Sequence, residues 1–182
     1  MRFRYPNGDK AFVEKNAAQP YRDWIAALNP SEENLIKTSK SLMGLPYLWG
    51  GTSPKGVDCS GYTKTIYFLN GIIIPRDASQ QAHTGKLVDS TRNFENLIPG
   101  DLLFFGRAAT DSTAESVVHV GMWIGNNQFI HSSGNVHIST FDTTATDFDE
   151  ANYNRYLRTK RLLNVEDIAL INLKESRIFS KE

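Results

Sequence analysis

The order of secondary-structure signals along the 182 residues is the feature that most limits the fold of this chain. Helical patterns come first, whereas from Leu102 onward short apolar runs alternate with turn residues, a pattern typical of strands. Helices followed by closely spaced strands predict an α+β domain in which the helices pack on an antiparallel sheet. The strands are expected at Leu102–Phe105, Val117–Ile124, Gln128–Ser132, Val136–Thr140 and Tyr156–Leu163.

Two helices are expected before the central part of the chain. Pro20–Leu28 predicts a short connecting helix or turn, and a second helix is expected to begin at Ser31, whose hydroxyl can cap it. Glu32 and Glu33 would then favour the positive end of the helix dipole, and Gly44 is expected to end the helix.

Shorter segments complete the expected topology. A turn followed by one short strand is predicted in residues 1–15, and this strand must pair with the main domain or belong to another module. Gly71–Pro75 favours a short strand, and Arg76–Gln81 a turn that opens a short helix. Asn164–Glu182 is a charged tail for which the pattern predicts no definite structure.

Composition limits the classes of protein and partner. With 40% hydrophobic residues and 20 basic against 20 acidic residues, the chain can form one globular domain and has no net charge. We therefore expect no nucleic-acid partner, and the apolar runs are too short to predict a membrane span. No signal-like segment follows Met1, so a secreted protein would have lost its signal before this sequence begins.

Cys59 is the only cysteine in the chain, which excludes an internal disulfide. Glycine-rich turns precede it, and an apolar helical pattern follows it and ends before Gly71. The sulfur is thus expected in the first turn of a helix, where the helix dipole and free N–H groups favour the thiolate and can lower the pKa of the thiol. Such a place suits a nucleophile, although a lone cysteine also commonly fills a core.

Two of the four histidines provide partners for this sulfur. His119 and His131 bracket Gly125–Asn127, and a three-residue loop between two strands would place both imidazoles on one face of the sheet. If that face packs on the helix of Cys59, then Cys59 can attack a carbonyl, His119 can take its proton and His131 can orient His119. This order of groups is similar to that of papain-like cysteine peptidases.

Other interpretations of these histidines stay open. His119 alone would more often be a core residue, and His83 and His137 are expected to be structural or exposed. Cys59 with the two paired histidines contains zinc-ligand types, but the close ligand pair that usually anchors a zinc site is missing. We therefore expect no metal and no cofactor.

Six motifs occur along the chain: Tyr47-Leu-Trp-Gly-Gly, Asp58-Cys-Ser-Gly-Tyr, Pro75-Arg with Ser79-Gln-Gln, Pro99-Gly-Asp-Leu-Leu-Phe-Phe, His119-Val-Gly-Met-Trp-Ile-Gly and Phe129-Ile-His-Ser-Ser. Taken together, they resemble the NlpC-type cell-wall peptidases, a papain-related family. The resemblance covers roughly 31–163 and implies a papain-like fold with the nucleophile at a helix N-terminus. It also implies a cysteine endopeptidase of peptidoglycan stem peptides that cleaves between γ-D-glutamate and the diamino acid, L-lysine or meso-diaminopimelate. Residue by residue, it implies Cys59 as nucleophile, His119 as base and His131 as third polar residue.

Four residues near the sulfur are expected to bind substrate. A free stem peptide begins with an L-alanine ammonium, which Asp58 and the Ser60 hydroxyl can hold. Tyr47 and Trp49 would line the cleft, and the Tyr47 hydroxyl with the N–H of Cys59 could stabilise an oxyanion. Asp58 can equally cap the helix of Cys59. Arg76 and Asp77 are expected to form a surface pair of little energetic value.

The resemblance also predicts how the chain is divided. Residues 1–28 are expected to be an extension carrying the remnant of a bacterial SH3-like module plus a linker, and residues 29–182 the catalytic domain with its tail. Muropeptides are the expected partners, and the cell envelope or the exterior is the expected location, with recycling in the cytoplasm as the alternative. A non-catalytic cell-wall binding module of the same fold, or an amidase or acyltransferase with the same Cys-His-His site, stays open as a second function.

Overall fold

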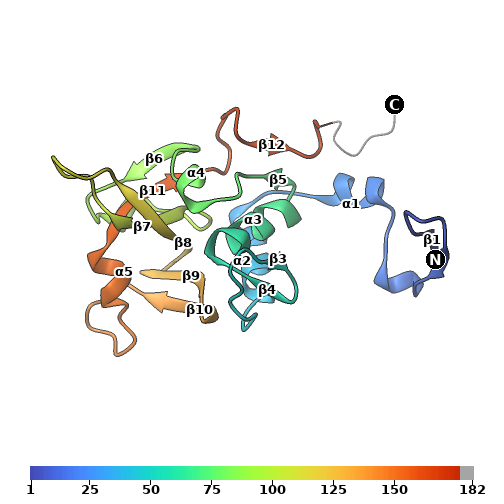
Figure 1. The fold of residues 1–182 in the computed structure, drawn as a ribbon, viewed down its shortest axis with the longest axis horizontal. Helices are drawn as coiled ribbons and strands as arrows, with labels where there is room; N and C mark the ends of the chain where they lie inside the picture. The colour runs from blue at the N-terminus through green and yellow to red at the C-terminus, as the bar shows by residue number, and fades with distance from the viewer. Residues whose placement is uncertain (177–182) are drawn as a thin grey trace.

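The fold is α+β, as the order of signals predicts. A computed structural model describes residues 1–176 and contains a six-stranded antiparallel sheet in the order β10-β9-β8-β7-β11-β6. Figure 1 shows this sheet on one side of the molecule and the helices α2 (Glu32–Ser41) and α3 (Cys59–Leu69) beside it. The strands are β6 (Lys86–Asp89), β7 (Leu102–Arg107), β8 (Ser116–Gly125), β9 (Gln128–Ser133), β10 (Asn135–Thr140) and β11 (Tyr156–Arg161). The five predicted strands of this sheet are all present, and of its six strands only the edge strand β6 was missed.

Side chains of the preceding residues cap the first turns of α2, α3 and α5. The Ser31 hydroxyl accepts a hydrogen bond of 3.3 Å from the N–H of Asn34, so the predicted start of α2 is confirmed. The short α5, which the sequence pattern did not predict, begins in the same way at Asp149. The helices are α1 (Tyr21–Ala27), α2 (Glu32–Ser41), α3 (Cys59–Leu69), α4 (Ala78–Gln81) and α5 (Glu150–Asn154), with 3-10 turns η1 (Lys15–Ala17) and η2 (Phe94–Asn96).

Each face of the sheet carries its own apolar core, because successive strand residues point to opposite faces. One core joins the sheet to α2 and α3, and its members include Leu35, Tyr62, Ile66, Phe104, Val120, Met122 and Ile130. The other lies on the opposite face and includes Leu103, Phe105, Trp123, Phe129, Phe141 and Tyr156. The central strands β7 and β8 contribute to both cores, which explains why they read as continuous apolar runs.

Three pairs of short strands lie outside the main sheet. They are β1 (Arg2–Arg4) with β2 (Lys10–Phe12), β3 (Thr52–Ser53) with β4 (Gly56–Val57), and β5 (Ile72–Ile73) with β12 (Ile171–Asn172). The strand predicted in residues 1–15 therefore pairs with its neighbour in a local hairpin and not with the main sheet. Figure 1 shows this hairpin at one end of the molecule, beyond α1.

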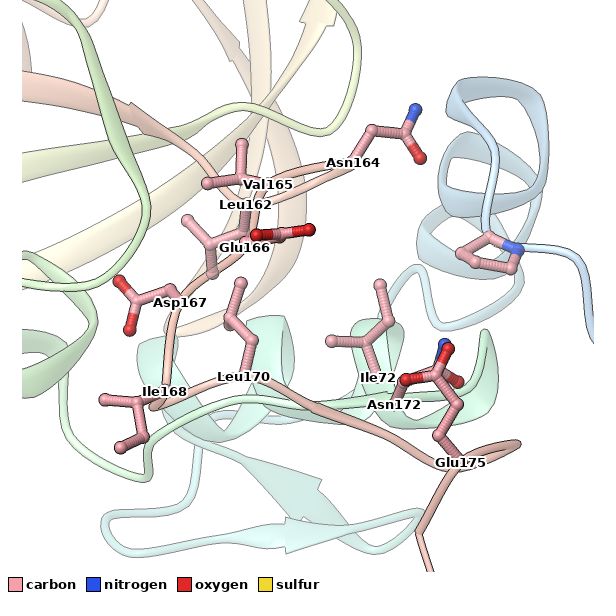
Figure 2. A pocket seen from close by; sticks show the side chains of 11 residues that line it. Ile72, Leu162, Asn164, Val165, Glu166, Asp167, Ile168, Leu170, Asn172 and Glu175 are labelled. Atoms are coloured by element: carbon pink, nitrogen blue, oxygen red, sulfur yellow. The ribbon is translucent and has the colours of Figure 1, made fainter.

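The charged tail has more structure than its sequence predicts. β12 pairs with β5, and Leu173 is buried, so the chain returns from the sheet to the helices. A pocket of about 820 Å³ is lined by residues of this segment, among them Leu170 and Glu166, and by Ile72 (Figure 2). The last part of the tail, 177–182, lies outside the described residues. Within residues 1–176, every helix is too short or too polar to cross a bilayer.

Candidate active site

Cys59 is the first residue of α3, as predicted. The carboxylate of Asp58 caps the helix and accepts a hydrogen bond of 2.7 Å from the N–H of Gly61. Gly61 is required in this turn, because a Cβ atom there would lie 2.1 Å from the carbonyl oxygen of Gly51. The preceding loop therefore packs directly on the first turn of the helix and fixes where the sulfur is presented.

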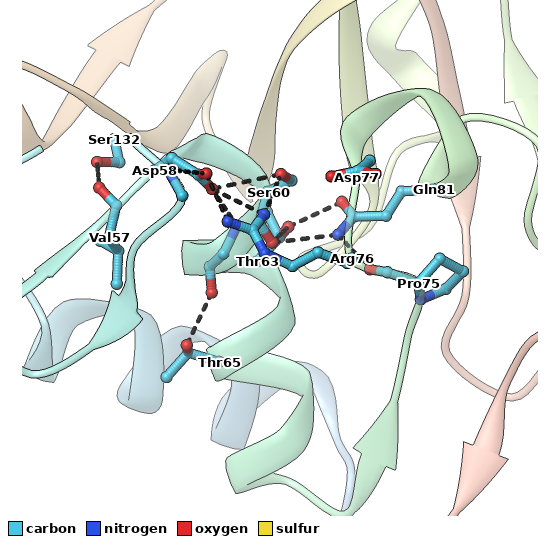
Figure 3. Close-up of polar contacts among 12 residues, drawn as sticks. Val57, Asp58, Ser60, Thr63, Thr65, Pro75, Arg76, Asp77, Gln81 and Ser132 are labelled. Carbon is cyan, nitrogen blue, oxygen red and sulfur yellow. Dashed lines mark hydrogen bonds and ion pairs between the residues drawn. The ribbon is translucent and has the colours of Figure 1, made fainter. Parts of the chain in front are cut away.

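Asp58 is also the centre of a polar cluster that the sequence did not predict. Its two oxygens accept from both terminal nitrogens of Arg76, at 3.1 and 2.6 Å, and from the N–H of Gly50 at 2.9 Å. The Ser60 hydroxyl donates to the same carboxylate at 3.3 Å. Figure 3 shows Arg76 lying across Asp58 and Ser60. The expected surface pair of Arg76 with Asp77 is therefore wrong in its partner, since the bidentate, partly buried ion pair is with Asp58.

These contacts set the charge of the cluster. Burial opposes ionisation of Asp58, but the hydrogen bonds from Arg76, Gly61 and Gly50 outweigh it and lower the pKa of this carboxyl. Arg76 also donates to the Ser60 hydroxyl, at 2.9 Å. The buried amide of Gln81 donates to the carbonyl of Ser60 at 3.1 Å, which ties α4 to the first turn of α3.

His119 and His131 lie on the same face of the sheet, as predicted, but for a different reason. The loop between β8 and β9 contains two residues, Asn126 and Asn127, both with positive φ, and not the three that the prediction assumed. A two-residue loop alone would have put the histidines on opposite faces. The register shift in β8 between Trp123 and Gly125 adds one residue and restores the parity.

The two imidazoles are joined by a hydrogen bond. Nε2 of His119 and Nδ1 of His131 are 2.8 Å apart, and both side chains are buried. Gly121, directly opposite His131, leaves room for this diagonal contact. Burial lowers the pKa of His119 to about 4, and that of His131 to about 3, so both rings are neutral near pH 7. Nδ1 of His119 is then the remaining ring nitrogen.

The face that carries the histidines is not the face on which α3 packs, which corrects the arrangement expected from the sequence. α3 packs on Val120, Met122 and Ile130, whereas His119 contacts Phe105 on the opposite face. Cys59 contacts β8 next to His119, close to where the pairing of β8 with β9 ends, at Gly121 and His131. There the backbone N–H of Val120, the residue after His119, hydrogen-bonds the sulfur.

The electrostatic state of the thiol also differs from the expectation. Burial raises the pKa of Cys59, and Asp58 adds to this effect, while the N–H groups of Val120 and of the first helical turn act in the opposite direction. The net pKa is raised and not lowered, because the sulfur is only 8% exposed. At neutral pH the resting site is therefore a thiol beside a neutral imidazole, and an attack by sulfur requires a base.

The structure places Tyr47 and Trp49 differently from each other. Tyr47 lies near the sulfur, since burial, Cys59 and Asp58 raise the pKa of its hydroxyl. Its backbone N–H donates to the carbonyl of Gly134, 2.8 Å away. Trp49 is 87% exposed, so its indole stands in solvent next to the loop and contributes little to the core. Of the four predicted substrate residues, Asp58 and Ser60 are in the polar cluster and Tyr47 is beside it.

Sequence reasoning missed three polar neighbours of His131. His137 is directly opposite it on β10, with ring centroids 4.4 Å apart. The Ser139 hydroxyl is 2.9 Å from Nε2 of His131, and the Asp149 carboxylate is 4.0 Å from the same nitrogen. The spacing of two residues between His137 and Ser139 was the available signal, because residues two apart on a strand share one face of the sheet. Asp149 lies in an irregular loop, which gives no such signal. In residues 1–176, no group of three or more His, Cys, Asp or Glu side chains is placed to hold a metal ion.

The sequence of the chain is similar to those of known peptidases. A gamma-D-glutamyl-L-lysine dipeptidyl-peptidase of Bacillus cereus is 43% identical over 155 residues, which is 84% of this chain and 44% of that protein. The probable endopeptidase NlpC of Escherichia coli is 39% identical over 52% of this chain and 56% of its own length. The chain thus spans less than half the length of the Bacillus relative.

The fold agrees with that of solved structures. The crystal structure of an NlpC/P60 family protein from Bacillus cereus superimposes with a TM-score of 0.71 and 40% identity, over 88% of this chain and 49% of the other. The model of the NlpC/P60 family matches residues 44–158, which include the helix of Cys59 and both paired histidines. The chain therefore belongs to the NlpC/P60 family.

Proposed function

We propose that this chain is a cysteine endopeptidase that hydrolyses peptidoglycan stem peptides between γ-D-glutamate and the diamino acid. The observation that carries the proposal is the contact of the Cys59 sulfur, at the start of α3, with the backbone N–H of Val120, the residue after His119, which is itself hydrogen-bonded to His131. Membership of the family and the name of the Bacillus cereus relative support this substrate class, and L-lysine before meso-diaminopimelate as the diamino acid.

Each group has a defined part in the proposed reaction. Nδ1 of His119 takes the thiol proton while the sulfur of Cys59 attacks the carbonyl carbon. The N–H of Cys59 and the Tyr47 hydroxyl stabilise the oxyanion, and the imidazolium then gives its proton to the leaving amine. Water, activated by the same imidazole, hydrolyses the thioester and restores the thiol. A neutral resting pair fits this sequence, because the low pKa of His119 leaves its lone pair free.

Asp58, Ser60, Tyr47 and Trp49 are proposed to bind the amino-terminal part of the peptide. Asp58 keeps its negative charge but already accepts from five donors, so a substrate ammonium must share the carboxylate with Arg76. The exposed indole of Trp49 is available for an apolar contact. A dipeptidyl-peptidase releases two residues from one end of a peptide, and the relative of that name supports a preference for a free amino terminus.

The division of the chain is also a proposal. Residues 1–28 are assigned to an extension that includes the β1–β2 hairpin, and residues 29–182 to the catalytic domain. The hairpin exposes Phe12 to 79% and Phe3 to 41%, which suits contact with another module such as an SH3-like domain. Trp24 contacts Phe68 of α3, so α1 connects the extension to the catalytic domain. The proposed substrate class supports a location in the cell envelope or outside the cell, with cytoplasmic recycling as the alternative.

Product analysis with defined peptides tests the proposed activity. The purified chain is incubated with L-Ala-γ-D-Glu-L-Lys, with the meso-diaminopimelate form and with a sugar-linked muropeptide, and products are identified by mass. We expect release of L-Ala-γ-D-Glu from the free peptides and none from Cys59→Ala. Cleavage only between sugar and peptide would establish an amidase instead. Turnover retained by Cys59→Ala, or no product from the wild type with its thiol reduced, would contradict the proposal.

A further inference from the structure

A line of polar side chains extends from His119 across three neighbouring strands. His119 is on β8, His131 on β9 and Ser139 on β10, and each is a diagonal neighbour of the next on one face of the sheet. Nε2 of His119 lies 2.8 Å from Nδ1 of His131, and Nε2 of His131 lies 2.9 Å from the Ser139 hydroxyl. All three side chains are buried, so these contacts are sheltered from water.

Asp149 closes this line at its far end. The Ser139 hydroxyl hydrogen-bonds its carboxylate. The backbone N–H of Asp149 donates to the carbonyl of Thr140, 2.9 Å away, which holds the residue beside β10. As N-cap of α5, the carboxylate accepts from the backbone and side chain of Asn152, at 2.9 and 2.6 Å. Burial opposes its ionisation, but these hydrogen bonds and His131 lower the pKa of Asp149, so it is an anion at neutral pH.

An ionised carboxylate can only accept hydrogen bonds, so Asp149 fixes which atom donates and which accepts in every hydrogen bond of this line. The Ser139 hydroxyl must then donate to Asp149, and its oxygen accepts the Nε2–H of His131. Nδ1 of His131 is consequently bare and accepts the Nε2–H of His119. Nδ1 of His119 is left with its lone pair, and this is the atom that must take the proton of Cys59 in the proposed reaction.

We propose that Ser139 and Asp149 are positioning residues that fix the tautomer and orientation of His119 through His131. The inference rests on the proposed role of His119 as the base. In an isolated neutral imidazole the proton can occupy either nitrogen, and a ring with the proton on Nδ1 could not accept from the thiol. The carboxylate also stabilises the imidazolium that forms during the reaction.

Two basic side chains oppose the effect of Asp149 on the paired histidines. Arg155, held by Asn152 at 2.9 and 2.8 Å, and His137, whose ring lies against His131, both lower the pKa of the paired histidines. Loss of the carboxylate would leave these groups unopposed. Protonation of the pair would then become harder, and the acid side of the kcat/KM profile would move to lower pH.

Nitrogen NMR of the imidazole rings tests the tautomers without requiring turnover. In the wild type near neutral pH we expect Nε2 protonated and Nδ1 bare in both His119 and His131. Ser139→Ala should release His131 into a mixture of tautomers, whereas Ser139→Thr should keep the pattern. Ser39→Ala is the matched control, since Ser39 is a buried serine of α2 whose hydroxyl donates to Ile36. Protonated Nδ1 in wild-type His119, or unchanged tautomers in Ser139→Ala, would overturn the inference.

Kinetics on the free stem peptide completes the test. Ser139→Ala should lower kcat roughly ten- to a hundredfold with little change in KM, and Ser139→Thr should restore most of it. Asp149→Asn, which keeps a helix-capping side chain, should move the acid limb of kcat/KM to lower pH. A uniform loss with an unmoved limb would reduce both residues to a structural role. An inactive wild type with the expected tautomers would instead contradict the proposed function alone.

Discussion

The two histidines differ in what their replacement should cost. In the proposed reaction His119 takes and returns the proton, so His119→Ala should lose activity nearly as completely as Cys59→Ala, since nucleophile and base act as a unit. His131 only orients the base, and His131→Asn can still accept from Nε2–H of His119. We expect this variant to lose roughly ten- to a hundredfold in kcat/KM. The measurement is hydrolysis of L-Ala-γ-D-Glu-L-Lys by folded protein. Complete loss of activity in His131→Asn would indicate that His131 is the base and His119 the orienting residue.

Asp58 caps the helix that begins at Cys59 and is also proposed to bind the substrate ammonium. Asp58→Asn keeps a capping group but removes the charge that faces Arg76, so we expect unfolding free energy to fall by about 1–3 kcal/mol. If the carboxylate also holds the L-alanine ammonium, kcat/KM should fall roughly ten- to a hundredfold on the free peptide and less on its N-acetylated form. The assays are denaturant unfolding and hydrolysis of both peptides.

Asp101 supplies a matched control for this variant. It forms a similar bidentate ion pair with Arg161, at 2.8 and 2.7 Å, and its carboxylate also accepts from the N–H of Ile98. Asp101→Asn should therefore cost comparable stability while the two peptides keep their relative rates. Equal losses on both peptides in Asp58→Asn would leave that residue a purely structural role.

At the scale of elements, the start of α3 depends on one glycine. A methyl group on Gly61 would lie 2.1 Å from the carbonyl of Gly51, so the loop and the helix must separate. Gly61→Ala should lower stability by about 1–3 kcal/mol. It should also lower kcat by more than roughly tenfold, because a shift of about 1 Å at a nucleophile is costly.

Gly44 provides the control for that substitution. It has a φ of +78° with open space around its Cα, so Gly44→Ala introduces backbone strain and no collision. The control should lose about 1–2 kcal/mol but keep its kcat per folded molecule. Thermal melts and active-site titration of Cys59 would be measured on both variants. Normal kcat in Gly61→Ala would show that the close packing of loop on helix does not position the sulfur.

The sequence predicted elements better than the contacts between them. Start signals at Ser31 and Asp58 are local, and both helices begin where these residues predict. The pairing of His119 with His131 was right only because a bulge in β8 compensated for a loop of the wrong length. The face of the sheet that α3 covers depends on the packing of the whole sheet. The sequence alone therefore did not show where Cys59 contacts β8. The ion pair of Arg76 with Asp58 was missed for the same reason.

At the scale of the whole molecule, short edge elements escaped prediction. β6 is mostly exposed and joins the sheet only through β11, so it lacks the apolar alternation that marks an inner strand. β12 has only two residues, and its pairing with β5 joins segments about a hundred residues apart. These additions close the fold around its two cores without altering the predicted α+β class.

The buried histidine pair should make folding stability depend on pH. Histidine in an unfolded chain has a pKa of about 6.5, whereas burial lowers the pKa of His119 to about 4 and that of His131 further. Between these values the unfolded chain binds more protons than the folded one, so acidification favours unfolding. Full stability from this source is present above about pH 6.5 and is lost progressively towards pH 4, by up to about 1.4 kcal/mol per pH unit for each histidine.

Carboxylates make folding stability depend on pH in a second, more acidic range. Asp58, Asp89 and Asp149 have lowered pKa values in the folded protein, because hydrogen bonds outweigh the effect of burial. Their contribution is present above the pKa of an unfolded aspartate, about 3.9, and is lost only as the pH falls below it. A decline of stability that begins near pH 6.5 must therefore come from the histidines and not from these aspartates.

Denaturant unfolding at several pH values separates the two sources. The wild type should lose stability steadily from about pH 6.5 to about pH 4.5, and the double variant His119→Asn/His131→Asn should show a much flatter dependence there, whatever its stability at neutral pH. His83→Asn, which replaces an exposed histidine, is the matched control and should follow the wild type. Equal slopes for wild type and double variant would mean that the pair is protonated in the folded protein. The neutral resting state required of the proposed base would then be wrong.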